Sequence, residues 1–217
     1  MLVRPRVCLG KRNTCVKKDI MMNPLKILHP VVLAVPQKDQ NLRGKDKVAV
    51  LRRLARQALR LSARYSELIL EKIQKDASGV PLPDRGVFWS LTHKEAYVAA
   101  VAATSTIGID LETLRPVSQA LYRRLAREPE WALATQVDIP LFFRFWTAKE
   151  AVLKAVGIGF AGLSHCCIRE IVDDCRLRLS YDESQWMVQH YWIGRQHLAA
   201  ITAGQKSVQW HLHNDQN

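Results

Sequence analysis

The sequence has few of the features that mark secreted, disulfide-stabilised or membrane-spanning proteins. Its 217 residues include five cysteines, an odd number, and none of them forms a Cys-x-x-Cys pair. A disulfide framework or a zinc site is therefore not expected, whereas a reducing, cytoplasmic setting is. No apolar run approaches the roughly 20 residues that a membrane-spanning helix needs, so no membrane partner is expected.

Negative charge is also scarce in this chain. There are 20 acidic and 32 basic residues, which gives a net charge of +12. This balance favours anionic partners such as phosphorylated ligands, acidic proteins or nucleic acid, without choosing among them. The basic residues lack the interleaved aromatic residues that stack on bases, so nucleic acid is the least expected of the three.

The charged residues among the first 24 are all basic except Asp19. This segment lacks the continuous apolar core of a secretory signal. We predict a disordered basic tail over residues 1–24. Met21 and Met22 stand immediately before the first core-like segment, so a start codon at one of them is an alternative.

Hydrophobic periodicity predicts a mixed α+β chain whose 48 % apolar content is that of a globular protein. A helix over residues 45–72 is expected to have one apolar side and a second side that carries five arginines. These are Arg52, Arg53, Arg56, Arg60 and Arg64. A second helix is expected over 118–134. Strands are expected at 25–35, 87–91, 96–103, 107–111, 166–172, 176–180, 186–193, 197–202 and 208–211.

Two short segments concentrate acidic residues and lysines. Side chains alternate along a strand, so Asp110 and Glu112 in and just after the 107–111 strand point the same way. Thr147 and Glu150 have the spacing of a capping box, which predicts a helix beginning at about residue 147. Glu150 and Lys154 then share one helix face. Three carboxylates and nearby lysines suit a hard cation such as Mg²⁺ that holds a phosphate ester.

Each of these features also has an ordinary explanation when it is taken alone. Glu150 could serve only as a capping residue, and Glu150 with Lys154 could be a surface pair of the helix. Asp110 and Glu112 could be the solvated end of a strand. The function therefore depends on the motifs occurring together.

Together the motifs resemble those of the 4′-phosphopantetheinyl transferases of the longer, single-chain type. The resemblance covers residues 78–163. It is carried by Phe88-Trp89-Ser90-Leu91-Thr92-His93, by Gly108-Ile109-Asp110-Leu111-Glu112, and by Trp146-Thr147-Ala148-Lys149-Glu150-Ala151 with Lys154 and Gly157-Ile158-Gly159. The resemblance implies two similar α/β halves, 25–103 and 104–213, related by a pseudo-twofold axis, with the active site in the cleft between them.

The implied reaction transfers the 4′-phosphopantetheine arm of coenzyme A to a serine of an acyl, polyketide or peptidyl carrier protein. Adenosine 3′,5′-bisphosphate would be released, and a monomeric enzyme is expected. Asp110, Glu112 and Glu150 would bind Mg²⁺. The alternatives are a basic nucleic-acid-binding module and a relative that docks carrier proteins without catalysis. The complete set of three carboxylates argues against the second.

The resemblance also implies roles for residues around the metal ligands. Lys154 would stabilise the bridging oxygen or protonate the leaving group, Lys149 would neutralise a phosphate, and His93 would contact a phosphate of coenzyme A. Glu130 is our candidate for the general base, with Glu128 as the competing choice. Arg53 and Arg56 are our candidates for binding the 3′-phosphate, since the guanidinium group suits phosphate.

One position departs from the family pattern, and one segment suggests a docking surface. Many members have a basic residue inside a Gly-Lys-Pro turn, where this chain has Gly79-Val80-Pro81. One phosphate contact is therefore missing or is supplied elsewhere, by Arg85 or by the arginine side of the first helix. Arg123, Arg124 and Arg127 alternate with apolar residues and are expected to dock an acidic carrier protein.

Overall fold

The structure is a computed structural model that describes residues 27–214, so the predicted tail and the alternative start at Met21 or Met22 lie outside it. The first part of the chain forms β1 (Ile27–Leu28), β2 (Val31–Ala34), α1 (Gln37–Gln40), α2 (Gly44–Tyr65), β3 (Phe88–His93) and β4 (Tyr97–Ala103). The remainder forms β5 (Ile109–Thr113), α3 (Gln119–Leu125), α4 (Glu128–Trp131), α5 (Ile139–Val156), the 3₁₀ helix η2 (Gly159–His165), β6 (Cys166–Ile171), β7 (Arg176–Tyr181), β8 (Ser184–Ile193), β9 (His197–Thr202), β10 (Ser207–Val208) and β11 (His211–His213).

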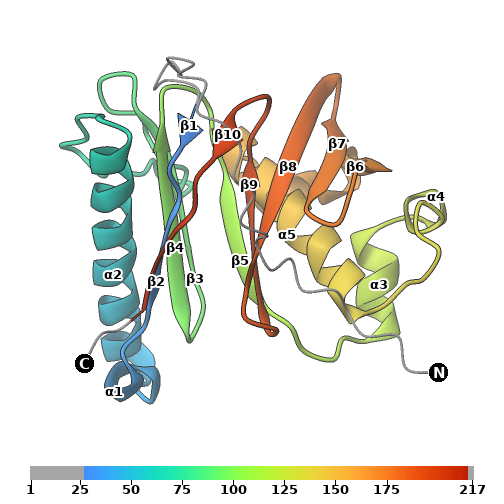
Figure 1. The fold of residues 1–217 in the computed structure, drawn as a ribbon, viewed down its shortest axis with the longest axis horizontal. Helices are drawn as coiled ribbons and strands as arrows, with labels where there is room; N and C mark the ends of the chain where they lie inside the picture. The colour runs from blue at the N-terminus through green and yellow to red at the C-terminus, as the bar shows by residue number, and fades with distance from the viewer. Residues whose placement is uncertain (1–26, 215–217) are drawn as a thin grey trace, which may run out of the picture.

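These elements form two parts side by side, and each part consists of a sheet with a long helix packed on it (Figure 1). A four-stranded sheet has the order β11-β2-β4-β3, a five-stranded sheet has the order β5-β9-β8-β7-β6, and β1 pairs with β10. The predicted α+β class is confirmed. Within residues 27–214, no helix is long and apolar enough to cross a membrane.

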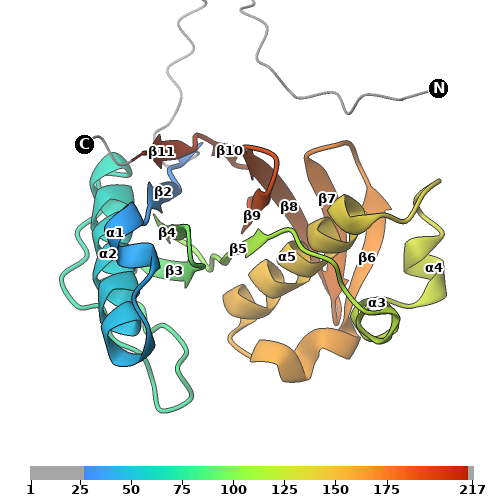
Figure 2. The ribbon, with the colours of Figure 1, turned by 90° about the horizontal axis from the view of Figure 1, so that it is seen from below.

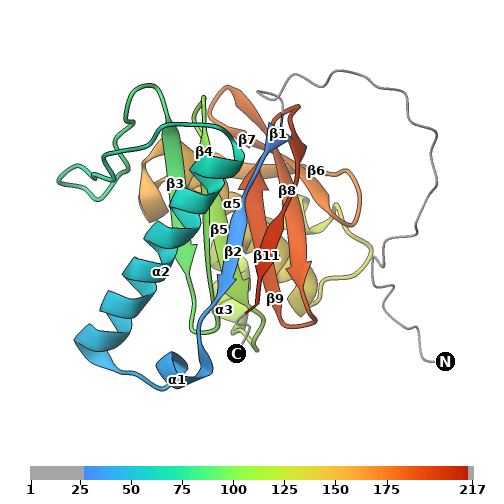
Figure 3. The ribbon, with the colours of Figure 1, turned by 60° about the vertical axis from the view of Figure 1, so that its left-hand side comes forward.

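Helix α2 covers one face of the four-stranded sheet (Figure 3). Its predicted apolar side is buried through Leu51, Leu54 and Ala58, while the five arginines are exposed. The helix ends at Tyr65, seven residues before the predicted end at 72. Glu67 has a left-handed φ of 54° and Leu68 donates its amide hydrogen to the carbonyl oxygen of Ala63, which turns the chain out of the helix.

Helix α5 packs against β5 and β9 of the five-stranded sheet (Figure 2). The prediction that it begins at about Thr147 is wrong, because it begins at Ile139. Asp138 caps it by accepting the amide hydrogen of Leu141, and Pro140 occupies a first-turn position that requires no amide hydrogen. Thr147 lies inside the helix, where its hydroxyl donates to the carbonyl oxygen of Phe143.

The predicted helix over 118–134 is two short helices instead of one. Helix α3 ends at Leu125, and α4 begins at Glu128. Pro129 lies in the first turn of α4, where its missing amide hydrogen is tolerated, whereas the interior of a continuous helix would need that hydrogen. Arg127 donates its amide hydrogen to the carboxylate of Glu130, which closes the start of α4.

The two sheets meet across a shared apolar core. Val32, Ala99 and Val101 of the first sheet pack with Ile109, Leu111 and Ile201 of the second. The last strand, β11, returns to the first sheet and pairs in parallel with β2, so the chain end does not stay in the predicted second half. The division at residue 103 and the pseudo-twofold relation stay predictions. The shared core brings β3 against β5, where the candidate site lies.

Candidate active site

The site begins with a close approach between β5 and α5. A Cβ atom on Gly108 would overlap the carbonyl oxygen of Ala151 and would lie 2.8 Å from the amide nitrogen of Ala155. Only glycine allows the start of β5 to lie this close to the backbone of α5. As a result, the α5 face that carries Glu150 and Lys154 reaches the side chains of β5.

Asp110 is the centre of the site. Its carboxylate is buried, and its Oδ1 atom lies 2.6 Å from Nζ of Lys154 and 3.2 Å from the hydroxyl of Thr92, which donates to it. Its other oxygen, Oδ2, is buried and accepts no hydrogen bond within the described chain. Oε1 of Glu150 is likewise buried and accepts no hydrogen bond within the described chain. A buried carboxylate oxygen without a donor is costly, so these two atoms mark a place suited to a cation.

Glu112 completes the carboxylate cluster, as we call Asp110, Glu112 and Glu150. Glu112 is 7 % exposed and forms an ion pair with Lys94 at 2.7 Å. Burial raises the pKa of Glu112, and the charge of Asp110 adds to this, against the hydrogen bond from Lys94. Burial also raises the pKa of Glu150 to about 7, with further contributions from the charges of Asp110 and Glu112. The cluster therefore concentrates more negative charge than its lysines neutralise.

The donor set of this cluster fits a hard divalent cation, which prefers carboxylate oxygens. In residues 27–214, however, no group of three or more such side chains is arranged as a ready-made metal centre. Lys154 pairs with Asp110, and Lys94 pairs with Glu112. The two unpartnered oxygens are the stronger indication, because ion pairs at partly exposed lysines exchange at little cost.

His93 lies at the end of β3, one residue after Thr92, and is exposed. Partial desolvation of its ring lowers its pKa, and the nearby charges of Lys154, Lys94, Lys75 and Arg52 lower it further. The predicted phosphate ligands Arg53 and Arg56 are exposed on α2, and their phosphate role stays a prediction.

Glu130 and Lys149 lie in a second place, on the side of α5 that faces α3 and α4. Lys149 is 1 % exposed, and its ammonium donates to the carbonyl oxygen of Leu125 and pairs with Oε1 of Glu130 at 2.7 Å. The same Oε1 accepts the amide hydrogen of Ile168, and Oε2 accepts that of Arg127. The base role of Glu130 and the phosphate role of Lys149 stay predictions. Glu128 is exposed in the first turn of α4.

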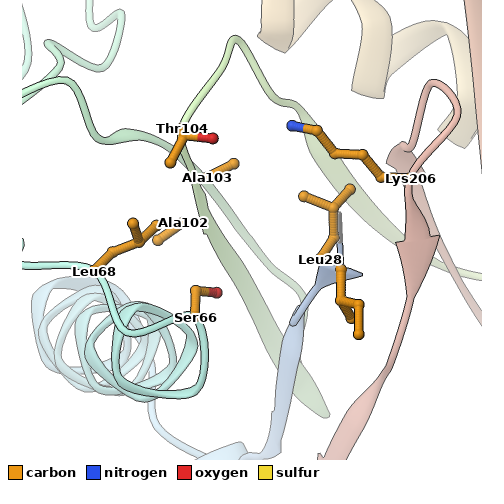
Figure 4. A pocket seen from close by; sticks show the side chains of 8 residues that line it. Leu28, Ser66, Leu68, Ala102, Ala103, Thr104 and Lys206 are labelled. Atoms are coloured by element: carbon orange, nitrogen blue, oxygen red, sulfur yellow. The ribbon is translucent and has the colours of Figure 1, made fainter. Parts of the chain in front are cut away.

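Two cavities lie apart from these residues. One lies between β1, β4 and the end of α2 and has a volume of about 10 Å³, which is room for one water molecule (Figure 4). The other has a volume of about 220 Å³ and is lined by residues 105–107, 185–187 and 202–206. Neither cavity is lined by a residue that the sequence analysis proposed for the active site.

Sequence reasoning assigned no role to two residues of the site, Thr92 and Lys94, which contact Asp110 and Glu112. Both are neighbours of His93 in the chain. Their contacts with β5 depend on the packing of β3 against β5, which the sequence does not reveal.

Comparison with known proteins agrees with this geometry. Residues 106–211 match the 4′-phosphopantetheinyl transferase superfamily. The chain is 42 % identical to the 4′-phosphopantetheinyl transferase HetI of Nostoc sp., over 42 % of this chain and 44 % of that protein. It is 26 % identical to the 4′-phosphopantetheinyl transferase gsp of Aneurinibacillus migulanus, over 40 % and 38 % of the two chains.

A third relative, the 4′-phosphopantetheinyl transferase psf-1 of Bacillus pumilus, is 26 % identical over 57 % of this chain and 56 % of its own. The chain thus spans about half the length of the curated relatives it matches. The matched residues include β5 with its two carboxylates and all of α5. Through residues 106–211, the chain belongs to the 4′-phosphopantetheinyl transferase superfamily.

Proposed function

We propose that this protein transfers the 4′-phosphopantetheine arm of coenzyme A to a serine hydroxyl of an acyl, polyketide or peptidyl carrier protein. The observation that carries this proposal is the buried carboxylate cluster, with its two unpartnered oxygens and with Lys154 on Asp110. Family membership supports the same reaction, because the relatives are named for it. A cytoplasmic location and a monomeric state remain predictions from the sequence.

Asp110, Glu112 and Glu150 would hold the Mg²⁺ ion. When bound there, Mg²⁺ offsets the negative charge of a pyrophosphate and polarises the phosphorus for attack. The chain itself would bind and orient the reacting groups. The hydroxyl of Thr92 donates to Oδ1 of Asp110, which would orient the carboxylate and leave Oδ2 available as a ligand.

Lys154 is placed to act on the bridging oxygen of the substrate. In the structure Nζ of Lys154 pairs with Oδ1 of Asp110 at 2.6 Å, and the lysine side chain is 30 % exposed. Because it is partly exposed, the ammonium would be able to turn to a phosphate oxygen of the substrate. It would stabilise the negative charge on the leaving adenosine bisphosphate or donate a proton to it.

Glu130 does not have the geometry of a general base in this structure. A base needs a free oxygen within hydrogen-bond reach of the attacking hydroxyl. Both oxygens of Glu130 accept hydrogen bonds from the chain, and the side chain is 6 % exposed. This geometry supports a structural role for Glu130 and its partner Lys149.

The proposed reaction is tested by incubating the protein with coenzyme A, Mg²⁺ and a panel of apo-carrier proteins, followed by intact-mass measurement. We expect at least one carrier to gain the mass of one phosphopantetheine arm, and to gain it only with Mg²⁺ present. Absence of any transfer across acyl, polyketide and peptidyl carriers would contradict the proposal.

We expect the carrier protein to dock beside α3. Arg123 and Arg124 are exposed in the last turn of α3, and the guanidinium of Arg124 lies 5.3 Å from the ring centre of Phe160. Phe160 is 41 % exposed and Ile158 is 47 % exposed, so a basic rim adjoins an apolar patch close to the end of α5. Acidic carriers would find charge and apolar contact together there.

Changing Arg123 and Arg124 to glutamate should therefore raise the KM for the carrier and leave the KM for coenzyme A unchanged, as measured by initial rates. The difference should shrink as salt rises, because the screening length falls below about 10 Å past 0.1 M. Arg60 and Arg64 on α2, changed in the same way, are the matched control. An unchanged carrier KM at low salt would place the docking surface elsewhere.

A further inference from the structure

The last strand of the fold, β11, lies at the edge of a sheet and is weakly held there by its backbone. It has three residues and pairs in parallel with β2, beside which it lies in Figure 3. The amide of His211 donates to the carbonyl oxygen of Pro30 at 2.9 Å. His211 is half-buried, whereas Leu212 and His213 are exposed. Because a short parallel pairing that buries little apolar surface is weak, the docking of β11 depends on contacts of its side chains.

The imidazole of His211 contacts rings from two other parts of the chain. Its Nε2 atom lies 3.1 Å from Nδ1 of His29, the residue that follows β1. The ring of Tyr65, the last residue of α2, is stacked on His211 with ring centres 4.0 Å apart and 7° between the planes. The hydroxyl of Tyr65 also lies 3.5 Å from Nε2 of His213. These contacts join β11 to α2 and to the segment between β1 and β2.

His29 is held in place by the first sheet and its helix. Its carbonyl oxygen accepts a hydrogen bond of 2.6 Å from the hydroxyl of Ser62, a fully buried residue of α2. The same hydroxyl accepts the amide hydrogen of Ala102 in β4 at 2.9 Å. The contact between His29 and His211 therefore connects the edge strand to a fixed point of the fold.

Whether the two imidazoles attract or repel depends on how many protons they carry. With one hydrogen between the facing nitrogens, one imidazole donates and the other accepts. A first added proton leaves this hydrogen bond possible, and the negative face of the Tyr65 ring tolerates one positive charge. A second added proton leaves an N–H group on both facing nitrogens and two positive charges next to each other. The hydrogen bond is then lost and the charges repel.

The surroundings of the pair supply no negative charge near neutral pH. The titratable groups that face it are Tyr65 from α2 and His213 from β11. Among residues 27–214, no carboxylate forms an ion pair with any of these three histidines. Burial lowers the pKa of His29, and burial together with the charges of His29 and His213 lowers the pKa of His211. The docked strand is therefore fully stable above pH 6.5, the ordinary histidine value, and loses stability as the pH falls through the lowered pKa values.

We propose that His29, His211 and Tyr65 form a pH-sensitive latch for the last strand of the fold. Strand β11 stays docked on β2 while at least one of the two imidazoles is neutral, and it detaches when both are protonated. Because β11 covers the edge of β2, its release leaves that edge open. None of the latch residues belongs to the carboxylate cluster, so this inference does not rest on the proposed function.

The latch is tested by amide hydrogen exchange of the full chain, followed by NMR between pH 7.5 and pH 5.0. Rates are expressed as protection factors, which remove the intrinsic pH dependence of exchange. We expect the protection factor of the His211 amide to fall roughly threefold to tenfold, the range that one lost hydrogen bond gives. At pH 5.0 it should lie below the protection factors of the β4 amides. Equal values would show that β11 opens only when the whole sheet unfolds, and they would overturn the latch.

Two variants remove one titrating partner each. His211→Phe keeps a ring on Tyr65 without a titratable nitrogen, so protection at position 211 should no longer fall with pH. His29→Gln offers an oxygen that accepts a hydrogen bond from a protonated His211, and the fall should disappear there too. Thermal unfolding at pH 7.5 checks that each variant is folded. A fall of wild-type size in either folded variant would refute the assignment to this pair.

His197→Phe is the matched control. His197 is also half-buried, lies edge-on to a tyrosine ring, that of Tyr97, at 4.9 Å, and has a pKa lowered by burial, but it lies in β9. The control should keep the wild-type pH dependence of protection at His211. Loss of that dependence in His197→Phe would mean that histidines elsewhere govern the release of β11, and it would overturn the latch.

Discussion

Replacing Glu150 or Asp110 by alanine is expected to lower the rate of phosphopantetheine transfer by at least about 10²–10³-fold, the usual loss when one preorganised electrostatic group is removed. Each carboxylate has a buried oxygen that no group of the described chain satisfies. Such an oxygen contributes nothing to the fold, whereas in the proposed function it would be a ligand of Mg²⁺. Glu150→Ala should therefore remove activity and leave folding intact. Asp110→Ala should also remove activity, at the cost of the contacts that Oδ1 makes with Lys154 and Thr92.

Stability gives this prediction a second measurement. Glu150→Gln keeps the shape of the side chain and removes a buried charge, so its Tm should equal or exceed that of the wild type without Mg²⁺. Transfer should nevertheless be lost. Glu183, an exposed acid in the turn before β8, offers a control substitution with no expected effect on either quantity. Near wild-type turnover in purified Glu150→Ala or Asp110→Ala with Mg²⁺ would refute the metal assignment.

The strand that carries Asp110 and Glu112 was predictable because its signal is local. Two carboxylates two residues apart on a short apolar strand must share a face, and β5 pairs with β9 so that Asp110 lies opposite Ala200 and Glu112 opposite Leu198. The small residue opposite Asp110 leaves room for its contacts. Likewise, the apolar side of α2 followed directly from the helical period.

The start of α5 was mispredicted because a capping pattern can occur inside a helix. Thr147 and Glu150 have capping-box spacing, but an interior threonine can instead donate its hydroxyl to the carbonyl four residues earlier. The sequence did hold the correct signal, since Asp138 followed by Pro140 is a typical helix start. The apolar run at residues 139–146 was assigned neither to the helix expected over 118–134 nor to the helix expected from 147.

The choice among charged residues could not be made from the sequence. Five arginines repeat along α2, and how each of them lies relative to β3 depends on how that helix packs against the sheet. The turn that contains Val80 lies against Gly157, a contact between segments that are far apart in the chain. Glycine at 157 could be expected at a helix end, but not that a valine would cover it.

Glu130→Gln is expected to lower the free energy of unfolding by about 3–5 kcal/mol, because it breaks a buried ion pair from one side. Glu130 receives hydrogen bonds from Arg127 and Ile168 and faces the ammonium of Lys149, which is 1 % exposed. A glutamine has only one acceptor oxygen, so at least one of these donors loses its partner. Lys149 would then be a buried charge without a counter-charge.

Urea unfolding of Glu130→Gln and of the control Glu128→Gln, whose side chain is exposed, measures this effect. We expect Glu128→Gln to leave the free energy of unfolding unchanged. The double change Glu130→Leu with Lys149→Met removes both charges and should recover part of the stability that Glu130→Gln loses.

The same variants decide the role of Glu130 in the reaction. A general base that is lost lowers kcat by about 10²–10⁴-fold without loss of stability. If Glu130→Gln unfolds at wild-type urea concentrations and shows such a fall in kcat, the predicted base role stands and the structural role is excluded. If instead stability falls and the folded fraction keeps its kcat, Glu130 and Lys149 act by holding α4 and β6 against α5.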